Sequence, residues 1–150
     1  FSEEMEFEQA AHLHKRMEKA AAVHQAAGEL ARDVSRLSGM AVLPASSPEA
    51  VLLCFFREGL WMPGALLSLT LDQGRPVPMD KRIRELVASL PEPKKLTVRE
   101  RQEHLSLLSA WFYSTSRDGE WVPIEDARTL PYRKLVNAVH RVAKAAATLA

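Results

Sequence analysis

The sequence predicts an α+β fold in which helices predominate: a long N-terminal helix, a small antiparallel β-meander and then three helices. Three observations lead to this prediction. Residues 3–37 are rich in Ala, Glu, Lys, Arg and Leu without proline, residues 51–56 are β-prone and almost continuously apolar, and apolar residues recur at helical spacing from residue 79 onward. We therefore expect a helical segment over residues 1–38 and a small α+β domain over residues 39–150 packed with it.

The first predicted helix carries a seam of apolar and small residues whose spacing is typical of a helix that packs against another helix. The seam comprises Leu13, Met17, Ala20, His24, Ala27, Ala31 and Val34. Gly28 is about 1 kcal/mol less favourable than Ala within a helix, so one long helix and two helices hinged there both stay open. Ser38-Gly39 is expected to end the helix, because glycine is favoured just past a helix C-terminus.

The next stretch changes to the pattern of a meander, with three strands expected over residues 40–43, 51–56 and 60–71. The continuous apolar character of the second strand predicts that it is covered on both faces. Glu58-Gly59 indicates a short hairpin turn. Pro63 and Gly64 predict a bulge or irregularity in the third strand.

The remainder of the chain returns to helical patterns. One helix starts near Met79 or Asp80, ends before Pro91 and buries Ile83, Leu86, Val87 and Leu90. Thr97 to Glu100 has the spacing of a capping box, and the helix that it opens buries Val98, Leu105, Leu108 and Phe112.

After the Asp118-Gly119 turn, residues 120–124 are expected to form a short strand. Pro131 stands where a helix favours its first residue. The buried stripe of this last helix comprises Leu135, Val136, Val139, Val142 and Ala146.

Composition and charge exclude several classes of protein. Hydrophobic residues make up 47% and charged residues 26% of the chain, and the formal net charge is +1, so any basic surface is local. A single cysteine, Cys54, excludes an intramolecular disulfide and indicates a cytoplasmic protein. No apolar run reaches the roughly 20 residues that span a bilayer, so no membrane association is expected. Because the chain begins at Phe1, we expect it to be cut from a longer protein.

No residue set in the sequence predicts catalysis, a metal site or a cofactor. His12 and His14 lie about 200° apart around a helix and do not share an ion. Cys54 falls in the most apolar strand, where a buried structural thiol is expected rather than a nucleophile. The sequence contains neither a phosphate-binding glycine-rich loop nor a nucleophile elbow.

Two groups of side chains stand out weakly. The last helix places Arg133, Lys134, Asn137, His140, Arg141 and Lys144 away from its apolar stripe, which suits phosphate contacts with DNA, although a solvated amphipathic helix is the simpler interpretation. Aromatic residues gather around the Asp118-Gly119 turn, where core packing is favoured over base stacking: Trp111, Phe112, Tyr113 and Trp121.

Residues 5–18 resemble the UVR motif of the excinuclease ABC proteins, whose core reads Phe-Glu-x-Ala-Ala-x-Leu-Arg-Asp-x-Ile. The matching positions are Phe7, Glu8, Ala10, Ala11, Leu13 and Met17, and His14-Lys15 stands in place of Arg-Asp. Within that family the motif is a helical hairpin through which UvrC and UvrB recognise each other in nucleotide excision repair. The half of the motif that precedes these residues would lie before Phe1.

The resemblance to the UvrC proteins continues into the meander. There Cys54 to Leu60 is similar to an apolar run followed by Arg-x-Gly-x, in the same order and at a similar distance. The likeness covers roughly residues 3–71, and residues 72–150 show nothing that aligns. It implies a GIY-YIG nuclease relative whose catalytic domain precedes Phe1.

Our first hypothesis is therefore a noncatalytic interaction domain of a UvrC-like excinuclease repair protein. Its first helix would bind a UvrB-like protein or a second copy through Phe7, Glu8, Ala10, Ala11, Leu13, His14 and Met17. The alternative is a homo-oligomerising helical scaffold unrelated to DNA repair, which uses the same seam. Weak DNA contacts through the last helix accompany the first hypothesis.

Overall fold

The computed structural model describes residues 2–70, 77–126 and 128–149, without the side chains of residues 2–6, 23–27, 29 and 149. The chain forms two compact units, Phe1–Asp33 and Val34–Ala150, so that the boundary lies five residues before the predicted one. The first unit is one helix, α1 (Ser2–Leu30), which is continuous through Gly28. A Cβ atom added at Gly28 would meet nothing within 4 Å, so no packing demand breaks the helix there.

The prediction that Ser38-Gly39 ends the first helix is wrong. Helix α1 ends at Leu30, a short 3₁₀ helix follows over Val34–Arg36, and Ser38 and Gly39 open the first strand. Ala31 and Val34 therefore lie beyond the helical part of the predicted seam. Gly39 serves packing instead of helix termination, because the Trp121 indole lies against its Cα.

The second unit contains a five-stranded antiparallel sheet. Its strands are β1 (Ser38–Pro44), β2 (Ala50–Arg57), β3 (Leu60–Trp61), β4 (Ala65–Ser68) and β5 (Glu120–Pro123). The order is β3-β2-β1-β5, and β4 pairs with β2 beside β3. The predicted meander and the predicted strand near residue 120 are both confirmed, and β5 joins the meander by pairing with β1.

The third strand of the meander is interrupted as predicted. Phe56 pairs with Trp61 in β3, whereas Leu53 pairs with Ala65 in β4, so the strand gains one residue relative to β2 around Pro63 and Gly64. The β2–β3 turn has positive φ at both Glu58 (53°) and Gly59 (89°), which is the backbone of a two-residue type I′ hairpin. Leu71, predicted to end this strand, lies outside the described residues.

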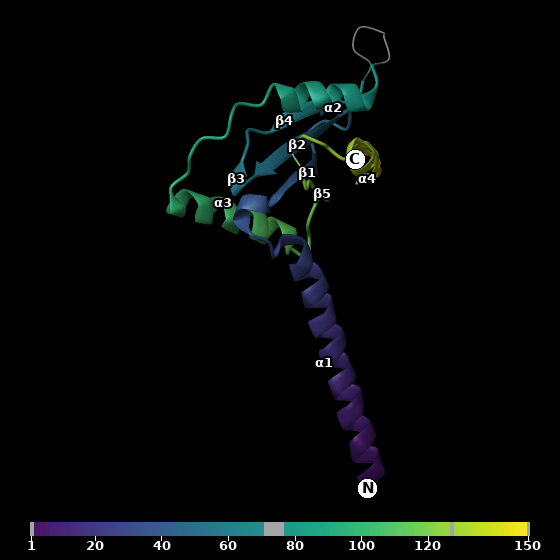
Figure 1. Cartoon of the computed structure of the whole chain (residues 1–150). Coiled ribbons are helices and arrows are strands. Elements are labelled where there is room, and N and C mark those ends of the chain that lie inside the picture. Colours follow the sequence, from purple (N-terminus) through teal and green to yellow (C-terminus); the bar gives the residue numbers. More distant parts are fainter. Residues whose placement is uncertain (1, 71–76, 127, 150) are drawn as a thin grey trace. The chain divides into compact units, whose positions relative to one another are not determined.

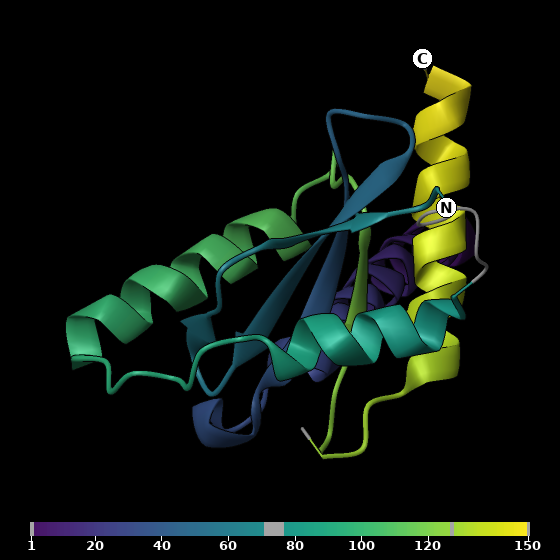
Figure 2. The ribbon, with the colours of Figure 1, turned by 90° about the horizontal axis from the view of Figure 1, so that it is seen from above.

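Helices α2 (Met79–Ala88), α3 (Val98–Phe112) and α4 (Tyr132–Leu149) cover the sheet (Figures 1 and 2). One sheet face and the inner sides of α2 and α4 form the main core. Its fully buried members include Met40, Val42, Val51, Ile83, Ile124, Leu135, Ala138 and Val139. The opposite face carries an aromatic cluster and packs on α3 through Leu108 and Phe112. The α+β class with predominant helices is confirmed.

The helix boundaries follow local sequence rules, with two corrections. Thr97 caps α3 with the predicted capping box: its hydroxyl accepts from the Glu100 amide at 3.2 Å, and the Glu100 carboxylate accepts from the Thr97 amide at 2.8 Å. Val98 does not join the buried stripe, because it is 76% exposed in the first turn. Pro131 immediately precedes α4 instead of being its first residue, and its carbonyl accepts from the Leu135 amide.

Candidate interaction surfaces

Helix α1 presents an apolar stripe to solvent. At 100° per residue, an arc of about 140° holds Phe7, Ala10, Leu13, His14, Met17, Ala20 and Ala21. The three large side chains are all exposed, Phe7 by 78%, Leu13 by 59% and Met17 by 64%. Ala11, also predicted to bind a partner, lies beside this arc. The side chains of His24 and Ala27 lie outside the described residues.

The side of α1 opposite the stripe is polar and charged. Lys19 lies about 160° from Met17 around the helix, together with His12 and with Glu8, which was predicted to bind the same partner as the stripe. Within the described part of α1, His14 Nε2 lies 3.5 Å from Glu18 Oε1, four residues further along the helix, and both side chains are well exposed. Helix α1 is therefore only weakly amphipathic, and its apolar side is the most hydrophobic exposed surface of the first unit as described.

Helix α4 carries the predicted basic face. Arg133, Lys134, Asn137, His140, Arg141 and Lys144 are all exposed, while Leu135, Ala138, Val139 and Val142 are buried. Sequence spacing thus placed the exposed and buried sides of this helix correctly.

Arg141 differs from the other cations of α4. Its guanidinium donates two hydrogen bonds, from Nε and Nη2, to the two carboxylate oxygens of Glu120 on β5, each 2.6 Å long. The hydrogen bonds from Arg141 lower the pKa of the Glu120 carboxyl, and the same bonds raise the pKa of Arg141. Arg141 is therefore engaged in joining α4 to the edge of the sheet, which the sequence did not reveal because the partners are 21 residues apart.

The prediction of core packing for the aromatic cluster holds for Phe112 and Trp121, which are buried, whereas Trp111 is half-buried and Tyr113 is exposed. Trp121 is buried at the centre of the cluster, in edge-to-face contact with Phe56, Trp61 and Trp111 at centroid distances of 6.3–6.4 Å. The Trp111 indole N–H donates to the Asp118 carbonyl, and the Arg117 guanidinium lies over the Trp111 and Phe112 rings. These contacts join the loop after α3 to the end of that helix.

His104 on α3 has a role that the sequence did not indicate. Its Nδ1 accepts a hydrogen bond from the backbone N–H of Trp61 at 3.0 Å, which ties α3 to strand β3. This bond requires an unprotonated Nδ1. A histidine in an amphipathic helix gives no hint of a strand partner 43 residues away, so only the fold shows this contact.

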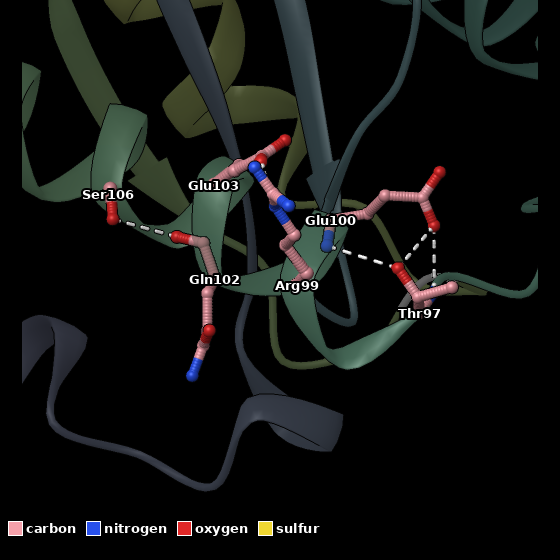
Figure 3. A network of polar contacts seen from close by, with 6 residues as sticks. All are labelled: Thr97, Arg99, Glu100, Gln102, Glu103 and Ser106. Carbon is pink, nitrogen blue, oxygen red and sulfur yellow. Dashed lines mark hydrogen bonds and ion pairs between the residues drawn. The ribbon is translucent and has the colours of Figure 1, made fainter.

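The outer side of α3 is stabilised by local polar contacts, shown in Figure 3. Arg99 Nε donates to Glu103 at 3.2 Å, and the Ser106 hydroxyl donates to the Gln102 carbonyl at 2.8 Å. The hydrogen bond from the Thr97 backbone N–H is the main cause that lowers the pKa of the Glu100 carboxyl, and the bond from the Thr97 hydroxyl lowers it further. These groups satisfy one another within the helix and converge on no common point.

Metal-binding and nucleophilic arrangements are absent from the described part of the chain. Within residues 2–70, 77–126 and 128–149, no three His, Cys, Asp or Glu side chains converge to hold a metal ion. Cys54 is half-buried, and burial raises the pKa of its thiol, which disfavours the thiolate. The helices as described include none that is long and apolar enough to cross a membrane.

Comparison with known proteins gives no match to a family model, a curated protein or a solved structure.

Proposed function

We propose that this chain is a noncatalytic protein-interaction domain of a UvrC-like excinuclease ABC protein that acts in cytoplasmic nucleotide excision repair. In this proposal α1 binds a helix of a UvrB-like partner. The observation that carries it is the exposed apolar stripe of α1, centred on Phe7, Leu13 and Met17. The resemblance of residues 5–18 to the UVR motif supports the choice of partner.

An exposed apolar stripe on a helix favours association for a physical reason. Most helices in proteins are stabilised by packing of their apolar side, because intrinsic helix propensity alone gives marginal stability in water. Burying exposed apolar area contributes about 25 cal/mol per Å². Ala10, Ala20 and Ala21 lie among the large side chains of the stripe and permit close approach of a second helix.

The charges beside the stripe set limits on the partner. Glu18 and Lys15 lie next to the stripe, on the side where Phe7 is its last residue. The polar side of the helix carries both positively and negatively charged side chains. A strongly basic or acidic partner gains little from such a mixture, whereas a helical hairpin with apolar residues and mixed flanking charges is well suited. A second copy of α1 would meet the same requirement, which is the homo-oligomeric alternative.

The test is a calorimetric titration of the chain with a synthetic helical hairpin that carries the UVR pattern. Phe7→Ala and Leu13→Ala each truncate an apolar contact of the stripe, and we expect about 30-fold or greater loss of affinity, the usual range for a central interface residue. Lys19→Ala is the matched control, because it shortens an exposed side chain on the opposite side of the same helix. Equal affinities for all variants contradict the proposal.

Sedimentation equilibrium distinguishes the two partners. A chain that does not self-associate through the stripe and binds the hairpin through it supports the repair assignment. A chain that self-associates through the stripe and ignores the hairpin overturns that assignment in favour of the scaffold.

A further inference from the structure

The hydrogen-bonding register shows which backbone groups of the sheet edges point outward. In an antiparallel pair, residues that exchange hydrogen bonds alternate with residues whose N–H and C=O point away. The Leu69 amide bonds the Glu49 carbonyl, so Leu67 and Ala65 of β4 also face β2. The N–H and C=O groups of Leu66 and Ser68 therefore point to the outer edge of β4.

The other exposed edges of this sheet offer fewer unbonded backbone donors. On β3 the same rule directs the Trp61 N–H outward, where His104 accepts its hydrogen bond. On β5 the Ile124 amide bonds the Ser38 carbonyl, so Pro123 and Trp121 occupy outward positions. Proline has no N–H to offer, which leaves the Trp121 N–H as the one outward donor of this strand. Natural proteins commonly protect sheet edges by these two devices, a covering element and an edge proline.

The edge of β4 has neither form of protection. No described residue bonds the backbone groups of Leu66 or Ser68 that point outward, and the Leu66 side chain is 66% exposed. A groove of about 360 Å³ runs beside the edge, between β4 and α2. Leu66, Leu67, Ser68, Val77, Arg82, Glu85 and Leu86 line it.

Charges of opposite sign stand on the groove side of α2. Arg82 and Glu85 are three residues apart, and no ion pair joins either to a described residue. The Arg82 guanidinium makes a single long contact, 3.5 Å, to the Thr70 carbonyl. A two-fold axis near this edge would set two α2 helices antiparallel and bring each Arg82 toward Glu85 of the other copy.

We propose that the open edge of β4 pairs with the same edge of a second copy. The strands run antiparallel about a two-fold axis at Leu67, so that Leu66 of each copy faces Ser68 of the other. Each of these two pairs exchanges two backbone hydrogen bonds, and Arg82 pairs with Glu85 across the axis. The edge is thus self-complementary in both hydrogen bonds and charge.

This inference goes beyond the proposed function and does not depend on it, because α1 takes no part in the pairing. A four-residue strand and one helix per copy form a small interface, which places the dimer among weak and transient complexes. Repair partners bound through α1 would then be presented in pairs.

The test is sedimentation equilibrium of the full chain with charge-reversal variants. R82E and E85R each convert two attractive pairs into repulsive ones, and we expect about tenfold or more weakening of the dimer. The double variant R82E/E85R restores the pairs and should return the dimer to near wild-type affinity. Lys81→Glu is the matched control, because Lys81 is an exposed cation of α2 that does not line the groove.

Leu66→Pro provides a second, independent variant. It removes an outward N–H without removing a bond to β2, so the fold stays intact by circular dichroism while the dimer is lost. Leu13→Ala, in α1, should leave this association unchanged. A monomer at every concentration up to about 1 mM, or a double variant no tighter than the single ones, overturns the proposal.

Discussion

Replacement of Gly39 by alanine should destabilise the second unit through a single added methyl group. An ideal Cβ there would overlap Trp121 Cζ2 and lie 2.6 Å from Cε2 and Cη2. The indole cannot move aside easily, because Phe56, Trp61 and Trp111 contact it on several sides. Overpacking of this kind costs about 1–3 kcal/mol, and we expect about 2–3 kcal/mol here because the neighbouring rings are rigid.

Urea denaturation followed by tryptophan fluorescence measures this loss, and a fall in Tm of roughly 10 °C should accompany it. Gly64→Ala is the matched control in the same sheet, since its Cβ would meet the mobile end of Leu52 at 3.1 Å and the Cys54 sulfur at 3.4 Å. We expect Gly64→Ala to change stability by less than about 0.5 kcal/mol. Equal effects of the two substitutions would refute the account of Trp121 packing.

Three further predictions concern the α4 surface and catalysis. Because Arg141 is bound to Glu120, the predicted DNA contacts of α4 that remain as cations are Arg133, Lys134 and Lys144. The logarithm of the affinity for any duplex should therefore fall by no more than about 2.7 per decade of salt concentration. In fluorescence anisotropy titrations, the double substitution Arg133→Ala/Lys144→Ala should reduce that slope by about 2. Arg141 lowers the pKa of Glu120, so their pair stabilises the fold fully above the ordinary glutamate pKa of 4.5, and this stabilisation is lost as the pH falls through the lowered pKa. In urea titrations, the stability advantage of wild type over Arg141→Gln should therefore shrink between about pH 7 and pH 3. The purified chain should not nick supercoiled plasmid in the presence of Mg²⁺ or Mn²⁺, and nicking that a point substitution in this chain abolishes would contradict its noncatalytic assignment.

Local patterns predicted the elements of the second unit well. The Glu58-Gly59 turn, the Thr97 capping box and the apolar stripe of α4 each depend on residues close in sequence, and all three are present in the fold. Local rules failed where a distant residue decided the outcome. Ser38-Gly39 resembles the end of a helix in sequence, but it lies in strand β1. Glycine is required at position 39 because the Trp121 indole occupies the space that a side chain would fill.

The predictions about the candidate sites also succeeded where they depended on residues close in sequence and failed where they depended on distant ones. Helical spacing placed the basic and buried sides of α4 correctly and the large apolar residues of α1 on one side, because the period of an α-helix is fixed by its backbone geometry. Glu8, predicted among the same contacts of α1, lies on the opposite side of that helix. The bond between Glu120 and Arg141, the contact of His104 with Trp61 and the open edge of β4 all depend on which strands pair, and strand pairing brings together residues far apart in the chain. Sequence periodicity carries no information about such partners.

The most direct test of the central proposal is site-specific photo-crosslinking from α1 to the synthetic UVR hairpin. A photoreactive residue in place of Met17 lies within the apolar stripe, and one in place of Lys19 lies about 160° away on the same helix. The proposal predicts a covalent adduct with the hairpin from position 17 and little or none from position 19. Equal labelling from both positions, or none from either, would contradict it.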